Sequence, residues 1–164
     1  MKSVKLYSIA EDFHHADKIW VLFSVVQDAV RVTLRESRAG LDLGLIEMGN
    51  TSTQLLSAFY PMGSNIIVLN KTPLKRVMQT NPGLMKPYVF AVLLHEYIHS
   101  LGYADESTAR KLTCSICASI FGDNIVTEMA CDMKKYMPYL MYPGGHPAST
   151  EMEVIELEDM DYIG

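Results

Sequence analysis

The chain has 164 residues, of which 49% are hydrophobic and 20% charged, a balance typical of one folded globular domain and not of a disordered chain. Its net charge of −5 excludes a broad basic surface, so we expect no nucleic acid partner. The N-terminus lacks the apolar core of a secretion signal and no apolar run is long enough to span a bilayer, so we expect a soluble, cytoplasmic protein without a membrane partner.

The first part of the chain has the pattern of a long helix followed by a strand. Apolar residues recur at helical spacing over residues 8–38, which predicts one amphipathic helix. Residues 41–48 alternate in part between apolar and polar positions, and a polar turn follows at residues 50–53. This pattern predicts a strand.

The middle of the chain contains two short β-prone runs separated by Gly63 and Ser64. The second run, "NIIVLN" at residues 65–70, is the clearest strand pattern in the sequence. Residues 72–80 predict a short helix, and Pro87 suits the first turn of the next one. The segment therefore predicts a small sheet followed by helices.

The helix that follows carries the most informative motif. Residues 88–107 read "YVFAVLLHEYIHSLGYADES", an apolar run that contains His95, Glu96 and His99 and stops at Gly102. At about 100° per residue these three polar side chains share the side of the helix away from the apolar arc. Histidines four residues apart can bind one tetrahedral metal ion, and Glu96 lies where it can reach a water on that ion. The spacing predicts a zinc site with His95 and His99 as ligands.

Residues 95–105, "HEYIHSLGYAD", resemble the H-E-x-x-H-x-x-G-x-x-(H/D) signature of the metzincin metallopeptidases, and the small chain is similar to the compact zincin-like proteins called minigluzincins. The resemblance implies an α+β, zincin-like domain over residues 1–148, with a long N-terminal helix, a small sheet and an active-site helix. It implies a zinc metallopeptidase in which Zn²⁺ activates a water and Glu96 is general base and then general acid. Its substrate, a peptide or an unfolded protein, would add as an extra strand to residues 65–70 at the edge of the sheet.

The third zinc ligand has three candidates. Gly102 can adopt the left-handed conformation that ends a helix, so the residues after it return towards the metal. Asp105 then occupies the third position of the signature and is our first choice, although it is also suited to cap the next helix. Glu106 has the longer reach and is the second choice. Glu128 is the third, because "EMACD" resembles the E-x-x-x-D of a gluzincin glutamate helix.

Three cysteines in a chain without a secretion signal predict reduced thiols and not a disulfide framework. Cys114 and Cys117 have zinc-ligand spacing, but no second pair accompanies them, so we interpret them as small buried hydrophobic residues. His146 lies in a glycine-rich loop. It is either a solvated loop residue or a group that swings over the metal site to stabilise an oxyanion.

Two other functions stay open. The stretch "LHEYIHSLGYADE" also resembles the H-G-x-x-H-x-x-G-Y-D-H stretch of the YbeY endoribonucleases, which implies a metal-dependent ribonuclease. Glu96 in place of glycine and the acidic net charge count against this alternative. The other is a non-catalytic or latent zinc-binding scaffold.

Residues 149–164 form an acidic C-terminal segment with apolar residues in alternation around "MEVIELE". A solvated acidic tail is the first interpretation. The alternation is also that of a half-buried strand, which would dock on the edge strand or along the cleft and hold the enzyme latent.

Overall fold

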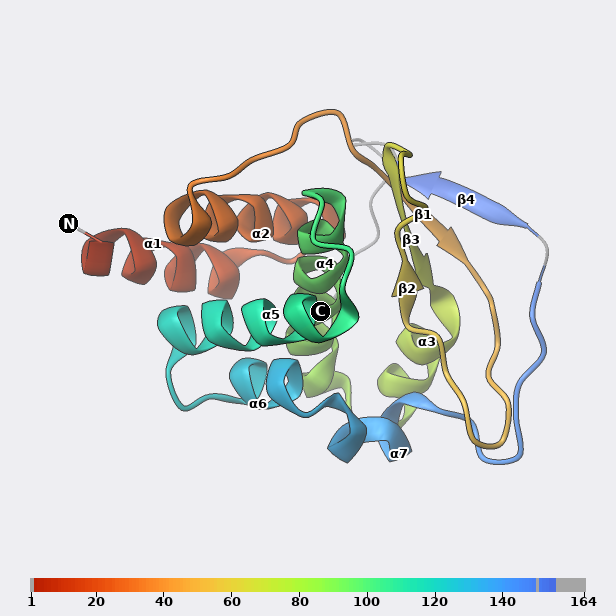
Figure 1. Cartoon of the computed structure of the whole chain (residues 1–164). Coiled ribbons are helices and arrows are strands. Elements are labelled where there is room, and N and C mark those ends of the chain that lie inside the picture. Colours follow the sequence, from red (N-terminus) through yellow and green to blue (C-terminus); the bar gives the residue numbers. More distant parts are fainter. Residues whose placement is uncertain (1, 150, 156–164) are drawn as a thin grey trace.

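The computed structural model describes residues 2–149 and 151–155. These residues have an α+β fold in which most helices pack together on one side of a small mixed sheet, so the α+β part of the predicted fold is confirmed (Figure 1). No helix in these two ranges is long and apolar enough to cross a membrane. The helices are α1 (Lys2–His15), α2 (Ile19–Leu34), α3 (Lys71–Thr80), α4 (Met85–Ser100), α5 (Glu106–Phe121), α6 (Ile125–Cys131) and α7 (Met137–Leu140), with 3-10 helices η1 (Pro82–Leu84) and η2 (Met133–Tyr136).

The sheet is built from four short strands, β1 (Asp42–Ile46), β2 (Ala58–Phe59), β3 (Ile66–Asn70) and β4 (Met152–Ile155). Their order is β2-β3-β1-β4, with β1 and β3 parallel and the two outer pairings antiparallel. The strands predicted at residues 41–48 and 65–70 are confirmed. The prediction that residues 65–70 form the edge is wrong, because β2 covers β3 on that side. β2 lies within the first of the two predicted β-prone runs, but its two residues are too few to predict that it pairs outside β3.

The N-terminal helical segment folds back on itself. The single helix predicted for residues 8–38 is wrong, because Lys18 is extended (φ −125°, ψ 149°) and separates α1 from α2. The bend lets Phe13 of α1 pack edge-on against Phe121, with ring centroids 4.9 Å apart. Burying apolar side chains of both helices therefore stabilises the protein more than one continuous helix would. This is a tertiary effect, so the local periodicity of the sequence does not predict it.

The helix α4 lies at the centre of the helical layer and packs against α2, α5 and α6. Phe90, Leu94 and Ile98 are completely buried on it. In residues 91–100, only His95 and His99 are incompletely buried. The packing of this helix therefore leaves its two histidines as the most exposed side chains of this range.

Arg38, in the segment after α2, connects the sheet to the end of α4. Its guanidinium group donates hydrogen bonds to the hydroxyl of Tyr60 (2.6 Å), the carbonyl of Ser64 (2.6 Å) and the carbonyl of Ser100 (2.7 Å). Tyr60 follows β2 and Ser100 is the last residue of α4. These three hydrogen bonds therefore fix the distance between β2 and the end of α4 that carries the histidines.

The C-terminal segment is part of the sheet over the described range. β4 pairs antiparallel with β1, with Val154 opposite Gly44. Ser149 N also donates a hydrogen bond to Glu47 O (2.6 Å). A free acidic tail is therefore the wrong interpretation for residues 152–155, which form a strand, but this strand pairs with β1 and not with residues 65–70. β4 lies at the opposite edge of the sheet from β2, and residues 156–164 of the predicted tail lie outside the described residues.

Candidate metal centre

Three of the predicted site residues meet at one point of the structure. His95 and His99 on α4 and Glu106 at the start of α5 place their ligand atoms within 4.8 Å of one another. Glu106 Oε1 lies 2.6 Å from His95 Nε2, and Glu106 Oε2 lies 3.0 Å from His99 Nε2. We call these residues the His–His–Glu triad.

The order of the acidic candidates differs from the one expected. The carboxylate of Asp105 caps α5, accepting hydrogen bonds from Thr108 N and Thr108 Oγ1, both at 2.8 Å. These bonds hold the pKa of Asp105 below its usual value. Asp105, our first choice, is therefore not in the triad, and Glu106 takes the third place. Gly102 adopts a positive φ of 106° and turns the chain from α4 towards α5, as expected.

The more distant candidates also lie elsewhere. Glu128 on α6 forms an ion pair with Lys135 and is not part of the triad. His146 Nε2 lies 3.0 Å from Glu47 Oε1, and its ring stacks on Tyr142 with centroids 4.3 Å apart. In this structure His146 fastens the segment before β4 to the end of β1, away from the triad.

The orientation of His99 depends on two residues that the sequence did not single out for this role. His99 Nδ1 lies 2.7 Å from the carbonyl oxygen of Tyr103, so Nδ1 carries the proton and donates it, and Nε2 carries the free lone pair. The hydroxyl of Tyr103 donates to Glu36 Oε1 (2.6 Å), in the segment after α2. A chain of contacts from Glu36 through Tyr103 therefore sets the direction of His99.

The geometry of the triad fits a divalent cation. The two Nε2 atoms of His95 and His99 are 3.2 Å apart. Two nitrogens bound at about 2 Å to one tetrahedral zinc ion would be about 3.3 Å apart. The carboxylate of Glu106 adds a negative charge to the two imidazoles. Residues His95, His99 and Glu106 would hold such an ion.

Glu96 is a buried carboxylic acid beside the triad. It is 8% exposed, and burial raises its pKa to about 7. Two charges have smaller effects on this pKa: His99 lowers it and Glu106 raises it. A backbone hydrogen bond from Tyr60 also favours the ionised form. Glu96 on α4 therefore contacts Tyr60, the residue after β2.

The charges of the triad influence one another. Burial lowers the pKa of His95, and Glu106 partly opposes this effect. Partial burial raises the pKa of Glu106, but attraction to His95 and His99 outweighs burial, and the pKa is lowered. A carboxylate facing two imidazoles is thus the favoured state of the triad.

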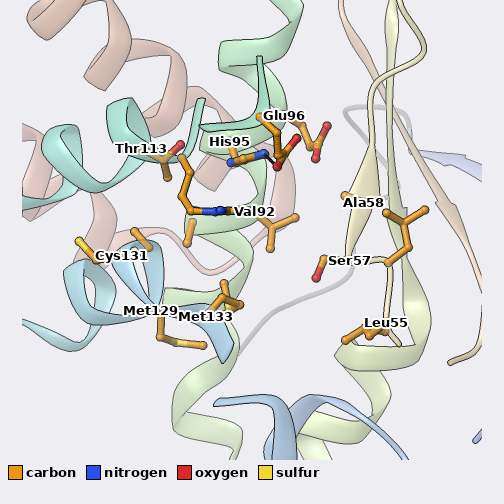
Figure 2. A pocket seen from close by; sticks show the side chains of 15 residues that line it. Leu55, Ser57, Ala58, Val92, His95, Glu96, Thr113, Met129, Cys131 and Met133 are labelled. Carbon is orange, nitrogen blue, oxygen red and sulfur yellow. Dashed lines mark ion pairs between the residues drawn. The ribbon is translucent and has the colours of Figure 1, made fainter. Parts of the chain in front are cut away.

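The triad opens onto a pocket of about 260 Å³. Figure 2 shows His95, Glu96 and Val92 on one wall and Leu55, Ser57 and Ala58 on the facing wall. Met129 and Met133 also line the pocket, as do the polar Thr113 and the cationic Arg110, so its lining is mixed. We call it the triad pocket.

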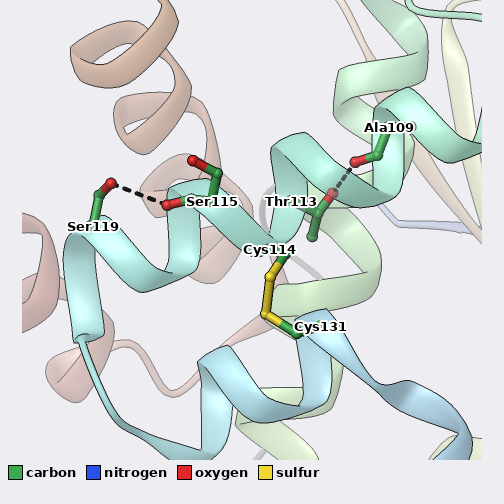
Figure 3. Close-up of a disulfide and its surroundings, with 6 residues drawn as sticks. All are labelled: Ala109, Thr113, Cys114, Ser115, Ser119 and Cys131. Carbon is green, nitrogen blue, oxygen red and sulfur yellow. Dashed lines mark hydrogen bonds between the residues drawn. A yellow bond between two sulfur atoms is a disulfide. The ribbon is translucent and has the colours of Figure 1, made fainter.

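A disulfide lies beside this pocket and contradicts the prediction that all three cysteines are reduced. Cys114 on α5 is bonded to Cys131 on α6, with Cα atoms 4.7 Å apart (Figure 3). The pairing depends on how α6 packs on α5, which the spacing of the cysteines does not reveal. Cys117 is free and buried as expected, and burial raises its pKa to about 12. Disulfides are rare in reducing compartments, so this bond counts against the predicted cytoplasmic location. That location stays a prediction.

Comparison of the chain with protein-family models, with curated proteins and with solved structures finds no match. The chemistry of the site therefore rests on the residues themselves.

Proposed function

We propose that the protein is a zinc-dependent peptidase. The observation that carries the proposal is the convergence of His95 Nε2, His99 Nε2 and the Glu106 carboxylate beside a pocket that His95, Glu106 and Glu96 line. Two histidines and a glutamate form the ligand set of several catalytic zinc sites, which keep a further position open for water or substrate. The H-E-x-x-H spacing, which predicts two histidine ligands with a glutamate beside them, also supports the proposal.

Each residue has a separate task in this proposal. Zinc held by the triad would supply a Lewis acid that polarises a carbonyl group and lowers the pKa of a water molecule. Glu96, adjacent to His95 in the chain and part of the pocket wall, would take the proton from that water and hand it to the leaving amine. The Tyr103 carbonyl would hold His99 with its Nε2 lone pair towards the ion.

Among the described residues no strand pairs with the outer edge of β2, and this free edge supports a peptide as substrate. Ala58 of β2 lies opposite Leu69 of β3. The neighbouring carbonyl of Ser57 accepts a hydrogen bond from Asn70 N (2.9 Å). Hydrogen-bonded and non-bonded pairs alternate along an antiparallel ladder, so the N–H and C=O of Ala58 point away from β3, on the free edge. An extended peptide can add there as a further strand, alongside the triad pocket that Ala58 lines.

The test is hydrolysis of an unfolded casein-type protein by the zinc-loaded enzyme. We expect cleavage that chelation abolishes and that zinc restores. Glu96→Gln should retain zinc but lose activity by about 100- to 10,000-fold, because general acid–base catalysis contributes a factor of that order. Glu128→Gln makes the same chemical change at a carboxylate outside the triad and should keep full activity.

Two results would contradict the proposal. Zinc-loaded protein that cleaves an RNA oligonucleotide but not casein would favour the ribonuclease alternative. Zinc-loaded protein that cleaves neither substrate would favour the non-catalytic scaffold.

A further inference from the structure

A second hollow in the structure has no role in the proposed chemistry. It has a volume of about 810 Å³ and is lined by residues before β2 and by residues from η2 to the segment after α7. Its apolar lining includes three methionines and two leucines: Met48, Met137, Met141, Leu55 and Leu56. We call this hollow the methionine groove.

The methionine groove adjoins the triad pocket. Leu55 and Leu56 line both hollows. In the chain they lie just before β2. Leu56 is 56% exposed, a high value for a large apolar side chain. From these shared residues we infer one cleft that runs from the methionine groove along residues 55–58 to the triad pocket.

The backbone along this cleft is able to bind another chain. In the described part of the protein, no hydrogen bond engages the N–H groups of Leu55 and Leu56, whereas the C=O of Leu56 accepts one from Asn70 Nδ2 (2.9 Å). Ala58 presents its N–H and C=O on the same free edge. Unpaired groups of this kind are a template for an added strand. The same extended polypeptide can therefore contact both hollows.

The lining of the groove indicates what such a chain would offer it. Methionine side chains are unbranched and polarisable, so they adapt to apolar side chains of different shapes and are common at promiscuous binding surfaces. Met48, Met137 and Met141 are each half-buried, so they are held in place yet reachable. The groove fits a large apolar side chain without demanding one particular residue.

We propose that the methionine groove is a substrate subsite that binds a large apolar side chain of an extended, unfolded polypeptide whose scissile bond lies at the triad. The inference deepens the proposed peptidase function and rests on it. Residues 55–59 span roughly 16 Å at about 3.3 Å per residue. In the bound substrate, the apolar residue in the groove is therefore about three to six residues from the residue in the triad pocket. The substrate class is then unfolded protein segments with spaced apolar residues, and short peptides bind poorly.

The first experiment measures binding and needs no turnover. Zinc-loaded Glu96→Gln protein is titrated into labelled twelve-residue peptides of Ser, Thr and Gln that contain two leucines, with the leucine spacing varied from two to eight. We expect the tightest binding at a spacing of about three to six, at least fivefold tighter than a peptide with one leucine replaced by serine. Equal affinity at all spacings would overturn the subsite.

The second experiment places the effect in the groove. Met137→Gln with Met141→Gln keeps the side-chain length and makes the groove polar, and should remove the spacing preference while the one-leucine peptide binds within twofold of before. Met62→Gln is the matched control, because Met62 is 67% exposed and lines neither hollow. A double variant that retains the spacing preference would overturn the proposal. The peptide series on the unmodified groove tests it even if the double variant does not fold.

The two proposals fail in different ways. Groove-dependent peptide binding without any hydrolysis by the enzyme with Glu96 intact removes the peptidase function and keeps the binding site. Hydrolysis of casein that is indifferent to the groove variants keeps the peptidase function and removes the subsite. A groove that instead joins two copies of the chain would show itself as a dimer that the double variant dissociates, and this result also removes the subsite.

Discussion

The two helices that supply the triad hold their side chains in different ways. α4 is buried along its last ten residues except at its histidines, whose side chains are 19% (His95) and 12% (His99) exposed. Glu106 lies in the first turn of α5, and its side chain is 60% exposed. Packing therefore fixes the two nitrogens, whereas the carboxylate depends on the turn at Gly102 and on the docking of α5. We infer that α4 defines the metal site and that α5 completes it.

The largest effect on zinc affinity should come from the α4 ligands. His95→Ala or His99→Ala should weaken zinc binding on the order of 100-fold or more, because binding energies of about 10 kcal/mol shared among three or four ligands give about 3 kcal/mol each. The measurement is competition with a chelating dye, together with metal content after dialysis. His15→Ala, at an exposed histidine on α1, is the control. Stoichiometric zinc in either α4 variant would remove the assignment of the site.

The next effect separates α5 from α4. Glu106→Ala leaves the two histidines in place, and water can occupy the vacated position, so we expect a smaller loss of zinc affinity, about 10- to 100-fold, or about 1.4 to 2.8 kcal/mol. Asp105→Ala removes only the cap of α5 and should change zinc affinity less than about twofold while lowering the melting temperature. If Asp105→Ala loses zinc and Glu106→Ala does not, the assignment of Glu106 as the third ligand is wrong.

A smaller effect tests whether the orientation of His99 is set from outside the triad. Tyr103→Phe removes the hydrogen bond to Glu36 but keeps the carbonyl that accepts from His99 Nδ1. Loss of direct partners of metal-binding histidines costs about 10- to 100-fold in affinity, and this hydroxyl is one step further away, so we expect less than about tenfold. Tyr7→Phe, at a tyrosine that is 68% exposed, is the matched control. Equal zinc affinity in both variants would show that the carbonyl alone orients His99.

Removing the disulfide should have only a small effect on zinc affinity, although its effect on stability is large. Cys114→Ser together with Cys131→Ser should lower the free energy of unfolding by about 3 kcal/mol, because the bond closes a loop with a sequence separation of 17. Zinc affinity should change only a few fold if packing on α4 is enough to place α5. A loss as large as that of Glu106→Ala would show that the disulfide positions the carboxylate.

Thiol counting tests the disulfide directly. Without reductant, the folded protein should expose no reactive thiol, because Cys117 is buried and burial raises its pKa to about 12. One thiol should react after denaturation and three after reduction. Three reactive thiols in denaturant alone would contradict the pairing of Cys114 with Cys131.

The difference between α4 and α5 also explains what the sequence predicts well. His95, Glu96 and His99 lie on one helix, so their spacing alone determines their relative positions. The choice between Asp105 and Glu106 depends on where the next helix begins and which carboxylate caps it. Periodicity does not locate such a boundary to within one residue.

The other corrections have the same cause. The bend at Lys18, the pairing of Cys114 with Cys131 and the edge position of β2 all arise from contacts between segments distant in the chain. The strand at residues 152–155 was visible as an alternating pattern, but its partner β1 was not. Local patterns thus predict elements and the residues within one element, and tertiary packing decides how elements meet.

The pairing of β4 with β1 has a consequence for how the chain folds. Gly44 and Val154 are partners in the ladder although most of the sequence separates them, so the loop between them must close before this pairing forms. During synthesis, β1 leaves the ribosome long before β4 and keeps an open edge that invites pairing with other chains. We therefore expect nascent or truncated chains that end before residue 152 to aggregate, and completion of the last strand to be a late event in folding.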